Sequence, residues 1–164
     1  MHVRLSTETD RYKIEELIRL CFGERQHSGA YENLSGRYLL ALQDEQIVAM
    51  TGLSYSETYN GYEIDWTCTH PEYRNKGIMH DLFKRICSLT DEDIYCSCWR
   101  IGNSQQINLS TLMQNFVFKE IIKNKASFDS RYNCRSARTY CVYAKGKSEC
   151  RCYEDLWLRK TDKR

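Results

Sequence analysis

Short runs in which apolar residues alternate with polar ones recur along the chain, and each is typical of a β-strand with one buried face. Tight-turn residues separate several of these runs. The pair Asn60-Gly61 is a strong turn signal, and the polar residues 43–46 join two further runs as a hairpin. The runs predict strands over residues 3–6, 37–42, 47–56, 62–69, 94–99, 118–123, 138–144 and 152–158.

Apolar residues at helical spacing predict three helices. The first begins at Thr9 or Asp10, the second covers residues 77–89, and the third begins at Asn103 or Ser104. Their apolar faces are predicted to be Ile14, Leu17, Ile18 and Cys21 for the first, Ile78, Leu82, Ile86 and Leu89 with Phe83 flanking for the second, and Ile107, Leu112 and Phe116 for the third.

The order of these elements favours an α/β fold in which a mixed sheet carries helices on both faces. A chain of 164 residues suits one compact domain. No glycine- or serine-rich linker, low-complexity segment or internal repeat divides it, and Pro71 is its one proline. We therefore expect a single domain over residues 1–164.

Charge and composition exclude several classes of protein. The net charge of +2 is too small to indicate a nucleic-acid or anionic-membrane partner. No apolar run approaches the length of a membrane span, and the first residues do not resemble a signal peptide. A cytoplasmic location is expected. The nine cysteines are then expected to be mostly reduced thiols.

Residues 70–79 carry the most informative chemistry in the sequence, because a basic turn with one glycine joins a predicted strand to a predicted helix. Backbone N–H groups at a helix start are unpaired and lie at the positive end of the helix dipole. Gly77 lets the main chain approach a bulky anion, and Arg74 and Lys76 add positive charge. This pattern predicts a pyrophosphate site. The glycine patterns of a dinucleotide fold and of a P-loop are both absent.

The run from Arg74 to Met79 resembles the Arg/Gln-x-x-Gly-x-Gly/Ala signature of the GNAT N-acetyltransferase superfamily, and the preceding His-Pro-Glu-Tyr is similar to the family's usual lead-in. Met79 departs from the family's Gly or Ala. The resemblance implies a central, mostly antiparallel sheet flanked by helices, with acetyl-CoA as co-substrate. It assigns cofactor binding to Cys68, Thr69, Arg74, Asn75, Lys76, Gly77, Ile78, Met79 and Asn108.

Candidate catalytic carboxylates lie on the strand before this turn. Simple alternation places Glu63, Asp65, Thr67 and Thr69 on one face and Ile64, Trp66 and Cys68 on the other. The position of Glu63, six residues before Thr69, is similar to that of the catalytic glutamate in the histone-acetyltransferase branch of the family. Glu63, or secondarily Asp65, could take the proton of an amine directly or through water. The alternative is a solvated strand face or carboxylates that bind a cationic substrate.

The family's usual general acid has no counterpart in the expected place. Many members use a tyrosine five residues before the strand that follows the third helix, and the corresponding residue here is Met113. A thioether cannot donate a proton. Protonation of the departing thiolate by water or by another tyrosine, such as Tyr31, Tyr140 or Tyr143, stays open.

The sequence thus predicts an N-acetyltransferase that moves an acetyl group from acetyl-CoA to a primary amine by direct attack in a ternary complex. Glu32, Glu57 and Asp65 hint at a cationic acceptor, either a small molecule or a peptide. The alternative is a non-catalytic acyl-CoA-binding or interaction module. A homodimer also stays open. A zinc site or disulfide is the minority interpretation of four late cysteines, against buried free thiols: Cys134, Cys141, Cys150 and Cys152.

Overall fold

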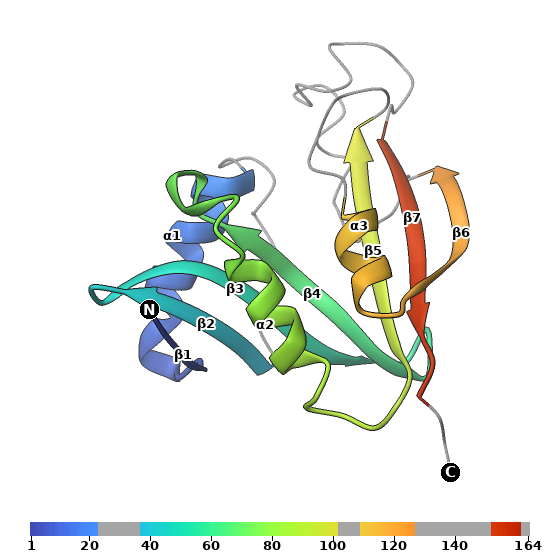
Figure 1. The fold of residues 1–164 in the computed structure, drawn as a ribbon, viewed down its shortest axis with the longest axis horizontal. Helices are drawn as coiled ribbons and strands as arrows, with labels where there is room; N and C mark the ends of the chain where they lie inside the picture. Colours follow the sequence, from blue (N-terminus) through green and yellow to red (C-terminus); the bar gives the residue numbers. More distant parts are fainter. Residues whose placement is uncertain (23–36, 102–108, 127–151, 162–164) are drawn as a thin grey trace. The chain divides into compact units, whose positions relative to one another are not determined.

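The computed structural model describes residues 1–22, 37–101, 109–126 and 152–161 (Figure 1). The chain forms two compact units, one of residues Met1–Ile94 with Lys160–Arg164 and one of residues Tyr95–Arg159. Strands and helices are mixed in both, and every strand pairing whose register is defined is antiparallel. The predicted α/β class, with mostly antiparallel strands flanked by helices, is confirmed.

The first unit is a four-stranded antiparallel sheet with a helix on each face (Figure 1). Its strands lie in the order β1-β2-β3-β4. The strands are β1 (His2–Leu5), β2 (Arg37–Gln43), β3 (Gln46–Ser56) and β4 (Gly61–Thr69), and the helical elements are η1 (Glu8–Asp10), α1 (Arg11–Phe22), η3 (Pro71–Tyr73) and α2 (Ile78–Ile86).

The second unit contains three described strands and one short helix. The strands are β5 (Ile94–Ile101), β6 (Lys119–Ala126) and β7 (Cys152–Arg159), and the helix is α3 (Ser110–Asn115). Their order in the sheet is β5-β7-β6, with β6 and β7 antiparallel. Seven of the eight predicted strands are therefore confirmed. The eighth, over residues 138–144, lies outside the described residues.

The start of the first helix differs from the prediction. Thr7, rather than Thr9 or Asp10, is the N-cap of η1, which runs directly into α1. The Asp10 carboxylate accepts hydrogen bonds from the Thr7 N–H at 2.8 Å and from two Arg4 nitrogens at 2.7 Å each. These bonds, the Arg4 pair first, hold the pKa of Asp10 well below its usual range. Asp10 thus ties β1 to α1 while it lies inside the turn.

The apolar faces of α1 and α2 are largely as predicted. Ile14, Leu17 and Ile18 of α1 are buried against a cluster that includes Met50 of β3. In α2, Phe83 is fully buried rather than flanking, and the helix ends before Leu89, which is half-buried. The stripe of Ile78, Leu82 and Ile86 is buried as expected.

The third helix buries a different residue from those predicted. Met113 is fully buried, whereas Leu112 and Phe116 are only half-buried. The chain turns at Val117, whose φ is 65°, and the Phe118 N–H donates to the Met113 carbonyl. The predicted cap residues Asn103 and Ser104, and Ile107, lie outside the described residues.

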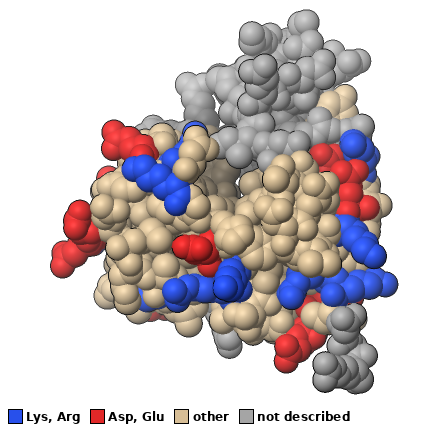
Figure 2. Space-filling model, in the orientation of Figure 1, with Lys and Arg blue, Asp and Glu red and all other residues tan. Residues whose placement is uncertain are grey.

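The surface carries both signs of charge. Lys and Arg side chains are interspersed with Asp and Glu side chains on the visible face of the molecule (Figure 2), in agreement with the small net charge of +2. Within the described ranges, no helix has both the length and the apolar character that a bilayer crossing requires.

Candidate functional site

The turn between β4 and α2 is built from local hydrogen bonds around His70. The His70 carbonyl accepts from the Tyr73 N–H at 2.9 Å, and its Nδ1 accepts from the Glu72 N–H at 3.3 Å. The Tyr73 ring meets the His70 ring edge-on at a centroid distance of 5.4 Å, and Lys76 Nζ lies 4.8 Å from the Tyr73 ring centroid. This cation–π contact holds the Lys76 ammonium beside the turn, whose residues Pro71–Tyr73 are not buried.

The main chain after this turn presents a row of unpaired donors. In the part of the chain that the structure describes, the N–H groups of residues 75–79 donate no hydrogen bond. The first intrahelical bond of α2 runs from the Asp81 N–H to the Gly77 carbonyl at 3.2 Å. Successive free amides at the positive end of a nine-residue helix suit a phosphate or pyrophosphate group.

Gly77 is the N-cap of α2, and its backbone conformation favours glycine. Its φ of 75° lies in the left-handed region, which β-branched and bulky residues rarely adopt. A Cβ built there would meet no atom within 4 Å. Within the described ranges, no atom fills that space, which leaves room for a ligand that approaches the amides. Asn75, with φ 60°, is a second left-handed position in the same turn.

Arg74 is tied back to the end of β4. Its Nε donates to the Thr69 carbonyl at 3.2 Å, and the same carbonyl accepts from Cys21 Sγ at 3.5 Å. A hydrogen bond from Cys68, opposed by burial and assisted by the Arg74 charge, lowers the pKa of the Cys21 thiol. The same thiol pair and burial raise the pKa of Cys68. Of the two thiols, Cys21 therefore loses its proton more readily than Cys68.

The predicted face of the candidate carboxylates is wrong in part, because β4 contains a bulge. Gly52 pairs with Asp65 and Met50 with Cys68, so two steps along β3 correspond to three along β4. Trp66, with φ 43°, lies at this irregularity. The extra residue reverses the alternation after Asp65.

The pairs across the sheet show which residues share a face. Thr67 Oγ1 lies 2.9 Å from Thr51 Oγ1, and Thr51 is two residues from Ala49, the partner of Thr69. Glu63 and Asp65 therefore share a face with Cys68, whereas Thr67 and Thr69 lie on the other. The carboxylates consequently lie on the α1 side of the sheet, where Cys68 and half-buried Trp66 join the α1 cluster.

Both carboxylates are half-buried on regular strand positions, Glu63 opposite Ser54 and Asp65 opposite Gly52. Glu57, the further candidate, is exposed in the turn between β3 and β4.

One residue near the carboxylates was missed by the sequence reasoning. Tyr38 of β2 pairs with Gly52, which in turn pairs with Asp65, so the three residues form a row across three strands. Tyr38 is 3% exposed, and its hydroxyl has no hydrogen-bond partner among the described residues. Burial and then the Asp65 charge raise the pKa of this phenol. The sequence signal that could have indicated this residue was Gly52, because a glycine inside an apolar strand often marks the close approach of another group.

The other predicted site residues are of two kinds. Met113, which the sequence resemblance aligned with the family's usual tyrosine, has a fully buried side chain. Cys96 and Cys98 are buried on one face of β5, with their sulfurs 3.9 Å apart. The remaining candidates lie outside the described residues, namely Tyr31, Glu32, Asn108, Cys134, Tyr140, Cys141, Tyr143 and Cys150. Among the described residues, no cluster of three metal-ligating side chains occurs.

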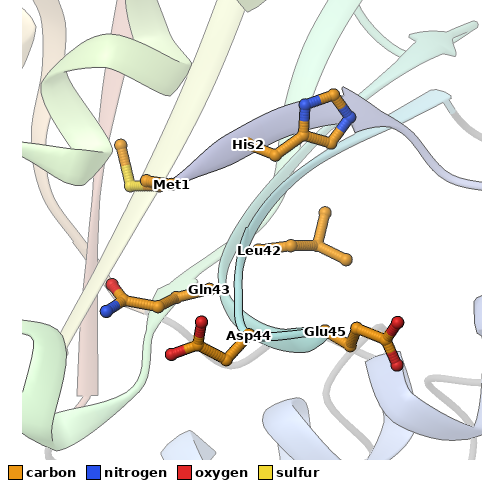
Figure 3. Close-up of a pocket in the computed structure, with 6 residues that line it drawn as sticks. All are labelled: Met1, His2, Leu42, Gln43, Asp44 and Glu45. Carbon is orange, nitrogen blue, oxygen red and sulfur yellow. The ribbon is translucent and has the colours of Figure 1, made fainter.

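A surface hollow lies beside the β2–β3 hairpin and contains none of the predicted site residues (Figure 3). It is lined by Met1, His2, Leu42, Gln43, Asp44 and Glu45. Asp44 and Glu45 form the two-residue turn itself, with φ of 49° and 64°, shorter than the four-residue connection expected. The hollow is thus a product of the hairpin turn.

Comparisons with solved structures agree with this architecture. An aminoglycoside 6'-N-acetyltransferase complexed with coenzyme A has a TM-score of 0.71 at 11% identity, covering 100% of this chain and 99% of that one. A GNAT family acetyltransferase from Elizabethkingia anophelis with acetyl-CoA bound gives 0.66 at 19% identity, covering 97% of each chain. The ribosomal-protein-S18-alanine N-acetyltransferase from Escherichia coli gives 0.67 at 8% identity, covering 97% of this chain and 94% of that one.

At these identities the likeness shows the fold alone. A comparison of the sequence with curated proteins found no match. The model of the acetyltransferase (GNAT) family matches residues 5–109, which include β4, the basic turn and α2. On that match, the chain belongs to the GNAT acetyltransferase family.

Proposed function

We infer that the protein is an acetyl-CoA-dependent N-acetyltransferase whose acceptor is a primary amine. The observation that carries this proposal is the run of five amides over residues 75–79, beside Arg74 and Lys76, that donate to no acceptor in the described part of the chain. Such a cradle suits the pyrophosphate of coenzyme A. Two of the similar structures hold coenzyme A or acetyl-CoA, which supports the same ligand here.

The residues around the turn have separate roles in this proposal. The amides of residues 75–79 hold the pyrophosphate, and the open space at Gly77 lets it approach. Lys76 adds charge from its place over Tyr73. The backbone of Cys68 and Thr69, at the end of β4, would guide the pantetheine arm toward the carboxylates. The bound thioester supplies the acetyl group.

Glu63 is the proposed general base. A protonated amine cannot attack a carbonyl, so one proton must leave the nitrogen before the new C–N bond forms. As the C–S bond breaks, coenzyme A departs as a thiolate that takes up a proton from water, and the nitrogen gives up its second proton to become the amide. Glu63 is half-buried on the face shared with Asp65, and it can accept this proton directly or through water. Direct attack by the amine in a ternary complex requires no further nucleophile from the protein.

One observation favours a second candidate, a non-catalytic acyl-CoA-binding module. The side chain at the position of the family's usual proton donor is Met113, which is fully buried and has no acidic proton. A protein that keeps the amide cradle and lacks an acid could bind acyl-CoA without turnover. Metal analysis of the purified protein, with and without Cys150→Ser, tests whether this candidate also carries zinc.

Free-thiol release from acetyl-CoA in the presence of a panel of amines separates the two candidates. The enzyme predicts turnover, with kcat lower by roughly 100- to 1,000-fold in Glu63→Gln and an unchanged affinity for coenzyme A. Glu92→Gln, a carboxylate change at an exposed position between α2 and β5, is the matched control and should keep full activity. Tight binding of coenzyme A without turnover on any amine would instead support the module.

A further inference from the structure

Two cysteines from separate elements lie together beside the basic turn. Cys21 is in the last turn of α1, and Cys68 is the second-last residue of β4. Both are free thiols, and a hydrogen bond links them. Cys68 belongs to the buried cluster that α1 forms with the sheet, and Cys21 packs against that cluster. Cys21 Sγ also lies 3.5 Å from the carbonyl oxygen of Thr69, the residue after Cys68. The fold thus brings two thiols together that are far apart in the sequence.

The two thiols differ in exposure and in charge environment. Cys68 is only 6% exposed, whereas Cys21 is half-buried. The hydrogen bond from Cys68 and the charge of Arg74 lower the pKa of the Cys21 thiol against the effect of burial, and the same hydrogen bond together with burial raises that of Cys68. Oxidants react with an accessible thiolate much faster than with a buried thiol. Cys21 is therefore the thiol that reacts first, and Cys68 is placed to react with its product.

A second pair of neighbouring thiols shows that short distance alone does not give this arrangement. Cys96 Sγ and Cys98 Sγ are 3.9 Å apart on β5. These residues are two apart on one strand, so their Cα atoms are roughly 6.6 Å apart, at the upper limit for a disulfide. Neither is more than 9% exposed. This pair has two buried thiols, whereas the pair at the basic turn has one half-buried thiol next to a cation.

We propose that Cys21 and Cys68 are a peroxide-sensitive dithiol that closes to a disulfide between α1 and the end of β4. The Cys21 thiolate attacks one oxygen of hydrogen peroxide, the O–O bond breaks, and hydroxide leaves, which gives a sulfenic acid on Cys21. Cys68 sulfur then attacks Cys21 sulfur, the S–O bond breaks, and water departs with the thiol proton of Cys68. Each sulfur loses one electron, and the peroxide gains both and ends as two water molecules.

The oxidation requires neither coenzyme A nor an amine, so the proposal is independent of the proposed function. The test titrates the reduced full chain with hydrogen peroxide, blocks the remaining thiols with N-ethylmaleimide and maps disulfides by peptide mass spectrometry. We expect the Cys21–Cys68 crosslink to be the first disulfide formed and to reopen with dithiothreitol. Cys96 and Cys98 should still be thiols at that peroxide concentration. A first disulfide that joins Cys21 to any other cysteine, or that joins Cys96 to Cys98, would overturn the proposal.

Cys68→Ala tests the order of the two steps. Without Cys68, the sulfenic acid on Cys21 should persist, and dimedone, a reagent for sulfenic acids, should label Cys21 after peroxide treatment. The wild type should show at least tenfold less dimedone on Cys21, because Cys68 consumes the sulfenic acid. Equal dimedone labelling of Cys21 in the two proteins would mean that Cys68 does not take part.

The melting temperature gives a readout that does not depend on peptide mapping. Closing the long loop between α1 and β4 restricts the unfolded chain, so peroxide should raise the Tm of the wild type by roughly 5–10 °C. Cys21→Ser keeps a hydroxyl that can donate to the Thr69 carbonyl, and its Tm should not rise. Cys87→Ser, at a buried cysteine outside the pair, is the matched control and should keep the rise. An equal rise in Cys21→Ser and the wild type would contradict the proposal.

Discussion

The basic turn over residues 74–79 and the strand β4 that precedes it are neighbours in sequence, yet their chemistry is specified differently. In the turn, the proposed functional groups are main-chain amides, and their direction follows from local backbone angles such as the φ of 75° at Gly77. In β4, the proposed functional groups are side chains. Their face depends on how β4 pairs with β3, where a bulge lies between Asp65 and Cys68.

This difference explains why the anion site in the turn could be predicted from the sequence, whereas the side-chain faces of β4 could be predicted only in part. A glycine at a helix start and two basic residues predict an anion site whatever lies elsewhere in the chain. Alternation predicts a face only while the strand stays regular. One extra residue at Trp66 moved Thr67 and Thr69 away from Glu63, and no local signal marked it.

The largest expected effect comes from the turn. Gly77→Val places a β-branched residue at a φ of 75°, so the turn must change its backbone to relieve strain. We expect the affinity for coenzyme A to fall about 100-fold, a free-energy change of ~3 kcal/mol, measured by calorimetry. Asn75→Gly is the matched control, since glycine accepts the φ of 60° and keeps the amide. Equal affinities of the wild type and Gly77→Val for coenzyme A would show that its binding does not depend on the conformation of the turn.

A smaller effect tests the bulge in β4. The hydroxyls of Thr51 and Thr67 are 2.9 Å apart across the strands, which requires Thr67 to face away from Glu63. A double-mutant cycle of Thr51→Val and Thr67→Val, measured by urea unfolding, should give a coupling free energy of about 1 kcal/mol. Strictly additive effects would mean that the two side chains do not meet and that the simple alternation holds.

The smallest effect is expected at Cys21, which interacts both with Thr69 at the end of β4 and with Arg74 of the turn. Cys21 donates to the Thr69 carbonyl, and its pKa is lowered by Cys68 and Arg74. A lowered pKa means more thiolate at neutral pH, so iodoacetamide should label Cys21 with a rate that rises at a lower pH than for an ordinary thiol. Coenzyme A bound at Arg74 should slow this labelling a few-fold, as followed by peptide mass spectrometry. Labelling of the buried Cys87 serves as the control. A rate unchanged by coenzyme A would place its binding elsewhere.

Elsewhere in the fold, too, features set by local sequence patterns were predicted, whereas features set by packing between separate elements were not. The succession of strands and helices along the chain, the stripe of Ile78, Leu82 and Ile86, and the turn at Asn60 follow from local patterns, and the described residues contain them. Burial of Met113 in α3 was not predicted, because it depends on how a short helix packs on other elements. The Tyr38 hydroxyl was missed for a related reason, since its setting is created by three strands.

The central claim is that the amides of residues 75–79 grip the pyrophosphate of coenzyme A. The most direct measurement is a titration of ¹⁵N-labelled protein with coenzyme A, followed through the backbone amide resonances. We predict saturable downfield proton shifts for the amides of Lys76, Gly77 and Ile78, because a phosphate oxygen becomes their first hydrogen-bond acceptor. Saturable shifts elsewhere in the protein, with these amides unmoved, would contradict the claim.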